Sequence, residues 1–428
     1  MKKLDCLLLA IFLSAFLGQA AEKKPAPSNW WKGNLHAHTF WSDGDDYPDM
    51  VVDWYKSRDY HFLMLSDHNT LQMTNRWVAM VATNRNSKMA FDKYLKRFGA
   101  EYVEVREDKG KQQVRLRELD EMQKYFNSAG RFLLMAGEEV TDRYKQVPIH
   151  INVTNVRELI KPRGGSNVVE VMQNNVNAVF EQRKKTGQPM FPHINHPNFG
   201  WAITAEELAQ VKGEQFFEVY NGHSSAANAG GTNRASTERI WDIILTKRVA
   251  ELKLSPMYGL ATDDGHNYHT NAFKANNPGR GWVMVRAAKL TAPLLVKALE
   301  AGDFYSSTGI RMKEITKDSK GISLDIDAEE GIEYTTQFIG TRKGYDPTNE
   351  PIRNAAGEPL RTTHTYSADI GAVLAEVKGA TAAYAFKGDE LYVRARVIST
   401  KLQENPYSKG ELEKAWIQPV ILGTRARK

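Results

Sequence analysis

The stretch GNLHAHTFWSDG, residues 33–44, brings two histidines and an aspartate together directly after a short apolar run. His36 and His38 are separated by one residue, and in a β-strand this spacing puts both imidazoles on one face, because side chains alternate with period 2. Taken alone, the pattern fits either a polar strand face or part of a metal site. The segments around it distinguish the two interpretations.

Five further apolar runs end in polar residues that can bind metal. Runs of this length, flanked by Gly, Pro, Asn and Asp, are typical of buried strands. They are HFLMLSDHN (61–69), RFLLMAGEEVTD (131–142), PMFPHINHPN (189–198), FFEVYNGH (216–223) and MYGLATDDGH (257–266). Helical patterns lie between them, at 48–58, 114–130, 166–187, 204–213 and 235–248.

Alternating strands and helices predict an α/β fold with a parallel sheet or a barrel. The position of the polar residues favours a barrel, because functional side chains of (β/α) barrels project from the carboxyl ends of several strands into one mouth. We therefore predict a barrel domain over 30–304. Ser166 and Thr204 fit helix N-caps, and Gly130 and Gly187 fit helix ends. The stretch 71–129 is longer than a typical connection and predicts a partly helical insertion beside the mouth.

The pattern changes from about Phe304 onward. Segments such as GISLDIDAEEG and ELYVRARVIST alternate apolar and polar residues between short turns, as half-exposed antiparallel strands do. We predict an antiparallel β-sandwich domain over 305–428. The stretch 343–359, rich in Pro, Asn and Gly, predicts an exposed loop within it.

The first twenty residues have the layout of a cleavable secretory signal. Lys2 and Lys3 precede an apolar run that is too short to span a membrane, and small residues follow at Ala20 and Ala21. The alternative is a retained N-terminal anchor. Cleavage would remove Cys6, the only cysteine, so that neither disulfides nor thiolate ligands would remain. We expect an exported protein, periplasmic or extracellular, without stable membrane insertion.

The charge of the chain excludes little. The formal net charge of +6 becomes +5 when the signal segment, with its two lysines and one aspartate, is removed. The basic residues are scattered, so no nucleic-acid groove is indicated, whereas an anionic substrate is compatible. The oligomeric state stays open.

Six of the eleven histidines lie in these strand-end segments or directly after one, and three carboxylates accompany them. Imidazole with carboxylate, in the absence of sulfur, suits Zn²⁺, Mn²⁺ or Fe²⁺. Nine such groups exceed the needs of one ion, so we predict two or three divalent ions. The nine residues are His36, His38, Asp43, His68, Glu139, His150, His196, Asp264 and His266.

The ordered series HAHTFWSDG, SDHN, GEEVTD, PIHINV, HINHPN and ATDDGH resembles the motifs of the polymerase and histidinol phosphatase (PHP) superfamily of metal-dependent phosphoesterases. The resemblance covers roughly residues 33–310. It implies a distorted (β/α)₇ TIM-like barrel with a centre of two or three metal ions. It also implies hydrolysis of a small phosphate mono- or diester by a hydroxide that bridges two ions.

The resemblance implies a ligand set for each ion. The first ion would be held by His36, His38, Glu139 and Asp264. The second would share Glu139 and add His150 and His196. The third would take Asp43, His68 and His266.

The chain departs from the family pattern at three positions. Some members have histidine where Asp43 stands. Glu139 is preferred to Glu138 because the family carboxylate stands two residues after the glycine. His196 is preferred to His193 because the family histidine precedes proline, which leaves His193 without a role.

Other polar residues are weaker candidates for catalysis beside Glu139 and Asp264. His223 fits a substrate contact or a proton donor, and equally a loop histidine. Arg143 and Arg280 suit phosphate oxygens, but each is equally compatible with an ordinary surface position. Asp67 is predicted to orient a ligand. The remaining histidines lack motif support and are interpreted as structural or solvated: His61, His269 and His364.

Two other functions remain open from the sequence. The same centre could hydrolyse an amide or a lactone, since the nucleophile would be the same. A non-catalytic binding protein with a structural metal site is the other class, and its expected mark, a missing ligand, is not seen in the motif series.

Overall fold

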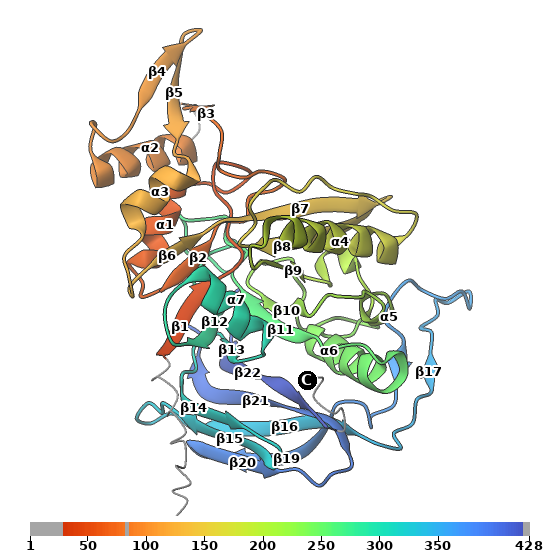
Figure 1. Cartoon of the computed structure of the whole chain (residues 1–428). Helices are drawn as coiled ribbons and strands as arrows, with labels where there is room; N and C mark the ends of the chain where they lie inside the picture. Colours follow the sequence, from red (N-terminus) through yellow and green to blue (C-terminus); the bar gives the residue numbers. More distant parts are fainter. Residues whose placement is uncertain (1–28, 82–84, 423–428) are drawn as a thin grey trace, which may run out of the picture.

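The computed structural model describes residues 29–81 and 85–422, so the signal segment predicted at 1–20 lies outside the described residues. Among the described residues, no helix combines the length and apolarity needed to cross a membrane. The chain forms a mixed α/β half and an antiparallel β half, and one nine-stranded sheet runs through both (Figure 1). The α/β class predicted from the sequence is confirmed.

The metal-capable segments lie on two sheets of the N-terminal half. One is the end of the nine-stranded sheet, in the order β12-β1-β2-β6, and the other is a five-stranded sheet in the order β11-β10-β9-β8-β7. The first set comprises β1 (Asn29–Asn34), β2 (Phe62–Met64), β6 (Leu133–Met135) and β12 (Trp282–Ala287). The second comprises β7 (Gly137–Tyr144), β8 (Val147–Thr154), β9 (Phe191–Ile194), β10 (Phe216–Asn221) and β11 (Tyr258–Thr262).

Residues 29–81 and 85–422 form no closed (β/α)₇ barrel, which corrects the prediction. Among the described residues, the backbone pairing between the two sheets consists of isolated parallel bridges, Ala37 to Gly265 and His68 to Glu139. The segment 131–142, predicted as one strand, breaks at Ala136 into β6 and β7, which belong to different sheets. β7 then pairs with β8 as an antiparallel hairpin, with no helix between them, so the alternation of strand and helix that builds a barrel is interrupted there.

Helices cover these sheets, and four of them lie close to predicted helical segments: α1 (Pro48–Lys56), α4 (Val168–Thr186), α5 (Ala205–Ala209) and α6 (Thr237–Thr246). The sequence patterns did not predict α7 (Ala292–Glu300), the 3₁₀ turn η1 (Phe199–Trp201) or the π-helical turn η2 (Lys247–Leu252). Thr204 caps α5 as predicted, and Gly187 ends α4 with φ of 68°.

Two predicted helix ends are wrong. Asn167, not Ser166, accepts the capping hydrogen bond from the Glu170 amide of α4. The helix predicted over 114–130 ends at Phe126, because Asn127 takes an extended conformation, and Gly130 lies in the turn beyond it. The first part of that segment is a strand.

The stretch 71–129 forms a projecting unit of strands and helices, at the upper left of Figure 1. Its elements are β3 (Arg76–Ala79), α2 (Arg85–Phe98), β4 (Val105–Asp108), β5 (Lys111–Leu116) and α3 (Leu119–Phe126). Trp41 and Tyr47 pack with Tyr94, Val114 and Leu116 in one apolar cluster. The unit therefore supports the loop that carries Asp43.

The C-terminal half packs two antiparallel sheets over an apolar core. Three strands, β14 (Met312–Lys317), β15 (Gly321–Ile326) and β20 (Thr381–Ala385), face the rest of the nine-stranded sheet. That sheet continues through β13 (Phe304–Ser307), β22 (Leu412–Ile421), β21 (Glu390–Leu402), β16 (Tyr334–Arg342) and β19 (Ala372–Lys378). The domain boundary predicted at 304/305 thus falls inside a continuous sheet rather than in a linker.

An arm of the C-terminal half reaches the helices of the N-terminal half. It includes the predicted loop 343–359, and β17 (Asn349–Glu350) within this loop pairs with β18 (Thr365–Tyr366) beyond it. Arg361 binds the carboxylate of Glu207 on α5, and the buried Arg394 guanidinium of β21 binds both oxygens of Asp242 on α6 at 2.7 and 2.8 Å. The two halves are fastened together by ion pairs as well as by the shared sheet.

Candidate metal centre

The ends of several strands bring the predicted ligands together. β1, β2, β9 and β11 end two to four residues before a ligand, while β7 and β8 carry a ligand within the strand. Each of the nine predicted ligands has a nitrogen or oxygen within 4 Å of a ligand atom of another: His36, His38, Asp43, His68, Glu139, His150, His196, Asp264 and His266. The metal interpretation of residues 33–44 is therefore favoured over a polar strand face.

The innermost group has the spacing that one ion requires. The Nε2 atoms of His36 and His38 lie 3.1 Å apart, and the two lie 3.4 and 3.2 Å from Oε2 of Glu139. They lie 3.1 and 3.2 Å from Oδ1 of Asp264. Two ligand atoms at about 2.0–2.2 Å from one ion are separated by about 2.8–3.6 Å at octahedral or tetrahedral angles. The donor set fits a divalent cation.

The two oxygens of Glu139 face different histidines. Oε2 is directed at His36 and His38, whereas Oε1 lies 2.9 Å from Nδ1 of His150 and 3.8 Å from Nε2 of His196. Among the described residues, Oε2 of Glu139 and Nδ1 of His150 are buried without a hydrogen-bond partner despite these short distances. Close approach of acceptor atoms without hydrogen bonds is expected of ligands arranged around cations, and the carboxylate is placed to bridge two of them.

A third, more exposed group surrounds Asp43. Its carboxylate lies 3.4 Å from Nε2 of His266, 3.5 Å from Nε2 of His68 and 3.4 Å from Nδ1 of His38. The Asp43 side chain is 55% exposed, against 1% for Glu139. This group therefore forms the solvent side of the centre, and the Glu139 groups form its interior.

Hydrogen bonds to acceptor-only oxygens fix the tautomers of two rings, those of His36 and His266. Nδ1 of His36 lies 2.7 Å from a carboxylate oxygen of Glu218, and Nδ1 of His266 lies 2.8 Å from the carbonyl oxygen of Asp264. Nδ1 of His68 contacts the Thr141 hydroxyl at 2.5 Å, but a hydroxyl can donate or accept, so this contact does not select a tautomer. A proton held on Nδ1 leaves the lone pair of Nε2 free for a cation, as ligand histidines require.

Glu218 is the main functional residue that the sequence did not reveal. Besides His36, its carboxylate accepts hydrogen bonds from the Thr262 hydroxyl, the His196 amide and the Asn221 side chain, at 2.7, 2.7 and 2.8 Å. A glutamate within the apolar run FFEVYNGH was the available signal, because a charge in a buried strand needs partners. Asn195, which donates to Oε1 of Glu139 at 2.8 Å, was missed as well.

The backbone is strained where it turns the ligands inward. Asp264 has φ of 50° and His196 has φ of 20°, and Asn69, which follows a ligand, has φ of 49°. Residues other than glycine rarely adopt positive φ, and such strain concentrates at functional sites. The strained residues lie just beyond the ends of β2, β9 and β11, at or next to the ligands that follow these strands.

Charges within the centre set its protonation. Burial raises the pKa of Glu139, but the neighbouring charges of His68, His150 and His36 outweigh burial and hold that pKa well below its ordinary value. The pKa of Asp264 is lowered in the same way, chiefly by His36. Burial lowers the pKa of His36, but Asp264, Glu218 and Glu139 together raise it well above its ordinary value. The carboxylates are therefore ionised, and protons compete with cations for the imidazoles.

Three residues near the ligands have other roles. Glu138 points away from the centre, as strand alternation predicts: it accepts from the Ile160 amide at 2.7 Å, and burial raises its pKa to about 8. His193 is buried with Nε2 3.5 Å from Glu218. Asp67 binds the Ser42 hydroxyl at 2.6 Å, and that hydroxyl lies 3.3 Å from Nδ1 of His38, so Asp67 acts on this ring through Ser42.

The structure separates the three weaker catalytic candidates. His223 lies at the rim, with its ring 5.4 Å from the ring of His266, and Arg143 is exposed on β7, four residues beyond Glu139. Arg280 is 1% exposed, and its guanidinium donates to backbone carbonyl groups, among them Gly222 at 2.8 Å. We therefore assign Arg280 to holding loops together rather than to contact with substrate.

The histidines without motif support lie outside the cluster. Nδ1 of His61 accepts from the Lys32 amide at 3.0 Å, and Nε2 of His269 lies 2.7 Å from the carbonyl oxygen of Asp45. Nδ1 of His364 lies 2.7 Å from the side-chain oxygen of Asn349. All three are engaged in local hydrogen bonds.

No protein-family model and no curated protein matches the chain. It is similar to a solved two-domain protein of Bacteroides vulgatus ATCC 8482 that contains a predicted PHP-like metal-dependent phosphoesterase. The identity is 16% and the TM-score 0.36, over 91% of this chain and 95% of that one. A second similar structure, from Bifidobacterium adolescentis ATCC 15703, is provisionally named a metal-dependent phosphoesterase, with 13% identity and a TM-score of 0.29 over 56% of this chain and 89% of that one.

Proposed function

We propose that this protein is a metal-dependent phosphoesterase of the PHP type that hydrolyses a small phosphate mono- or diester. The observation that carries the proposal is the Glu139 carboxylate, whose two oxygens face separate sets of histidines at the spacing of metal ligands: His36, His38 and His68 on Oε2, and His150 and His196 on Oε1. Divalent ions such as Mn²⁺, Zn²⁺ or Fe²⁺ held there would activate water and neutralise charge on phosphoryl oxygens. Residues of the chain would bind and orient the ester and donate hydrogen bonds to it.

The ligands form three groups in this proposal. Glu139 is common to the two inner groups and Asp264 adjoins both, so these two carboxylates fix the distance between the inner positions. The outer group around Asp43 is the part of the centre that faces solvent. A small ester would therefore approach from the Asp43 side, with its phosphoryl group foremost.

His223 is suited to donating a hydrogen bond to the ester. Its Nδ1 accepts from the Ser225 amide at 3.1 Å, and burial lowers the pKa of the ring to about 4. The ring is thus neutral at pH 7, with its proton on Nε2. We assign this N–H the role of donating a hydrogen bond to the leaving-group oxygen or to a phosphoryl oxygen of the substrate.

Arg143 is suited to binding the anionic part of the substrate. Alternation along β7 puts it on the same face as Glu139 and Thr141, beyond the centre and in solvent. A guanidinium at that position offers a planar pair of donors to phosphoryl oxygens. Replacement by glutamine should raise KM for a phosphate ester with a smaller effect on kcat.

The decisive experiment compares Glu139→Gln with Glu138→Gln. The two glutamates are adjacent and fully buried, but only Glu139 faces the histidines. Wild type and both variants would be loaded with Mn²⁺ or Zn²⁺ and assayed on phosphate mono- and diesters, with amides and lactones in parallel. We expect Glu139→Gln to lose several orders of magnitude in phosphoesterase turnover and to bind less metal, and Glu138→Gln to stay near wild type.

Three other outcomes of this experiment would change the proposal in different ways. Near wild-type turnover by Glu139→Gln would refute the bridging assignment. Turnover of only amides or lactones would keep the centre but replace the reaction. Metal binding without turnover of any ester, amide or lactone would favour a binding protein.

Export is the last part of the proposal. The layout of residues 1–20 motivates it. Mass spectrometry of protein from its native host should find a mature chain that begins near Ala21 or Glu22, outside the cytoplasm. An intact Met1 in the cytoplasm would contradict it.

A further inference from the structure

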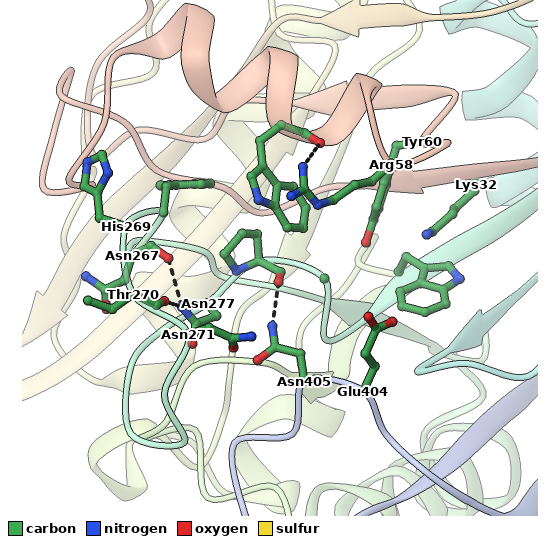
Figure 2. A pocket seen from close by; sticks show the side chains of 15 residues that line it. Lys32, Arg58, Tyr60, Asn267, His269, Thr270, Asn271, Asn277, Glu404 and Asn405 are labelled. Atoms are coloured by element: carbon green, nitrogen blue, oxygen red, sulfur yellow. Dashed lines mark hydrogen bonds between the residues drawn. The ribbon is translucent and has the colours of Figure 1, made fainter. Parts of the chain in front are cut away.

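A cavity of about 520 Å³ lies where α1, the loop 267–282 and the residues following β21 meet (Figure 2). A further cavity of about 420 Å³ adjoins it toward the β-sandwich. The two form one groove between the halves of the protein, since they share Lys32, Arg58, Gly279, Trp282, Glu404 and Asn405. The size is that of sites that bind small organic ligands.

The groove is separate from the metal centre. Lys32 and His36 lie on one face of the chain as it runs through and beyond β1, with Asn34 between them. The Asn34 side chain is buried and donates to the Tyr55 hydroxyl at 2.7 Å and to Asp263 at 3.1 Å. This hydrogen-bonded polar layer closes the space between the two sites.

Aromatic rings and two cations form one wall of the groove. Nζ of Lys32 lies 3.9 Å from the ring centre of Tyr60 and 4.2 Å from that of Trp282. The guanidinium of Arg58 lies 4.2 Å from the ring centre of Trp54. Such rings offer apolar faces and edges to a ligand, while the cations lie beside them.

Several polar groups in the groove have no hydrogen-bond partner among the described residues. The Lys32 ammonium has no acceptor, and burial lowers its pKa to about 8. The side chains of Asn271 and Glu404 are exposed and form no hydrogen bond within the described chain. Asn405 donates to the Pro278 carbonyl at 2.8 Å and keeps its side-chain oxygen available. Figure 2 shows these groups around a common space.

We propose that this groove binds an oligosaccharide that contains acidic sugars. A pyranose ring presents C–H groups on its faces and hydroxyls at its edge, which match the aromatic rings and the amide and carboxylate groups respectively. The unpaired Lys32 ammonium, with Arg58 beside it, calls for an anion, and a sugar carboxylate supplies one within the same ligand. The extension into the second cavity gives room for more than one sugar.

The test measures binding of uronic acid oligosaccharides to the full chain by titration calorimetry and tryptophan fluorescence. The probes are galacturonate, mannuronate, guluronate and glucuronate oligomers, each paired with its uncharged methyl ester. We expect the acid form of at least one probe to bind and its ester to bind at least ~10-fold more weakly, because a charged hydrogen bond is lost. Lys32→Gln should weaken binding by a similar factor, and Arg58→Gln, at an exposed position, should weaken it as well.

Two controls isolate the groove. Lys124→Gln removes the same charge from the exposed surface of α3 and should leave binding unchanged. Glu139→Gln should also leave it unchanged, which separates sugar binding from the proposed phosphoesterase activity. The proposal is overturned if no probe binds, if esters bind as well as acids, or if neither Lys32→Gln nor Arg58→Gln weakens binding. Loss of sugar binding in Glu139→Gln would overturn it too, because the sugar would then sit in the metal centre.

Discussion

Replacement of Glu218 by glutamine should weaken metal binding without unfolding the protein. The carboxylate accepts four hydrogen bonds: Oε1 accepts from His36 and Thr262, and Oε2 accepts from the His196 amide and Asn221. A glutamine keeps the shape of the side chain but has one oxygen and one NH₂ group. Either the two donors that now face Oε1 or the two that face Oε2 must therefore face the NH₂ group, which cannot accept a hydrogen bond.

The two orientations of the amide have different costs. With NH₂ toward His196 and Asn221, two buried donors lose their acceptor, at about 1–3 kcal/mol each. With NH₂ toward His36 and Thr262, the hydroxyl can rotate and the ring can change tautomer, so that both accept. The second orientation costs less and should prevail.

That orientation damages the metal site rather than the fold. A His36 ring that accepts on Nδ1 carries its proton on Nε2, the atom that lies 3.1 Å from Asp264 and 3.4 Å from Glu139. The lone pair for the cation is then lost unless the amide turns back. Loss of such a partner of a ligand histidine lowers metal affinity by ~10–100-fold, and we expect the same here.

Glu214→Gln is the matched control. Glu214 is also fully buried and lies four residues earlier, where one oxygen accepts the amides of Gln215 and Phe216. Burial raises its pKa to about 8, so at pH 7 it is already neutral and a glutamine resembles it closely.

The assay is competition for Zn²⁺ or Mn²⁺ against a chelator of known affinity, with thermal unfolding and circular dichroism in parallel. We expect Glu218→Gln to lose affinity by at least ~10-fold with a native spectrum, and Glu214→Gln to lose none. Wild-type affinity in Glu218→Gln would refute the tautomer reasoning. Equal losses in both variants would attribute the effect to general disturbance of β10.

Three further predictions follow from the charges of the structure. Four histidines have raised pKa values in the folded protein without metal: His36, His38, His68 and His266. After chelation the protein should therefore lose stability as the pH rises from about 6.5 through those values, whereas metal-loaded protein should gain stability because protons no longer compete with the ions. Thermal unfolding of both forms at several pH values tests this. Glu138 keeps its proton up to about pH 8 in the folded state, so the stability of wild type relative to Glu138→Gln should fall by up to ~1.4 kcal/mol per pH unit between about pH 4.5 and 8, measured by denaturant unfolding. Arg394→Met should cost ~3–5 kcal/mol, because it leaves Asp242 as an unpaired buried charge between the two halves, and Arg394→Met with Asp242→Leu should recover part of that loss; equal losses in the single and double variants would disprove it.

Most candidate ligands could be predicted because each closely follows or lies in a short segment that alone is enough to form a strand, whereas Asp43 lies in the loop beyond β1. His68 and Asp264 illustrate this, since β2 and β11 are buried runs of three and five residues and end just before them. A strand end fixes where its next side chains go, so local sequence carries the information. The same holds for Thr204 and Gly187, whose effects as cap and stop are confined to one helix.

Local sequence patterns could not distinguish a closed barrel from two separate sheets, because strand pairing is decided between distant segments. The run 131–142 reads as one strand, yet Gly137 lies so close to Met64 that a Cβ there would come within 2.2 Å of the Met64 Cγ atom. The chain turns at Ala136 and its second part joins another sheet. The apolar pattern gives no sign of that change of partner, because both parts would be buried in one continuous strand as well as in two strands of different sheets.

Arg280 and Glu218 show the same limit at the level of single side chains, with opposite results. Both are charged residues near ligand segments, and both are buried. The Arg280 guanidinium is directed at backbone carbonyls of its own and neighbouring loops, including Gly222 and Ala275, so its charge serves the fold. The Glu218 carboxylate is directed at His36 and at the His196 amide, so its charge serves the centre. What separates them is the identity of the groups that replace water around each charge, and those groups come from strands and loops that meet only in the folded protein.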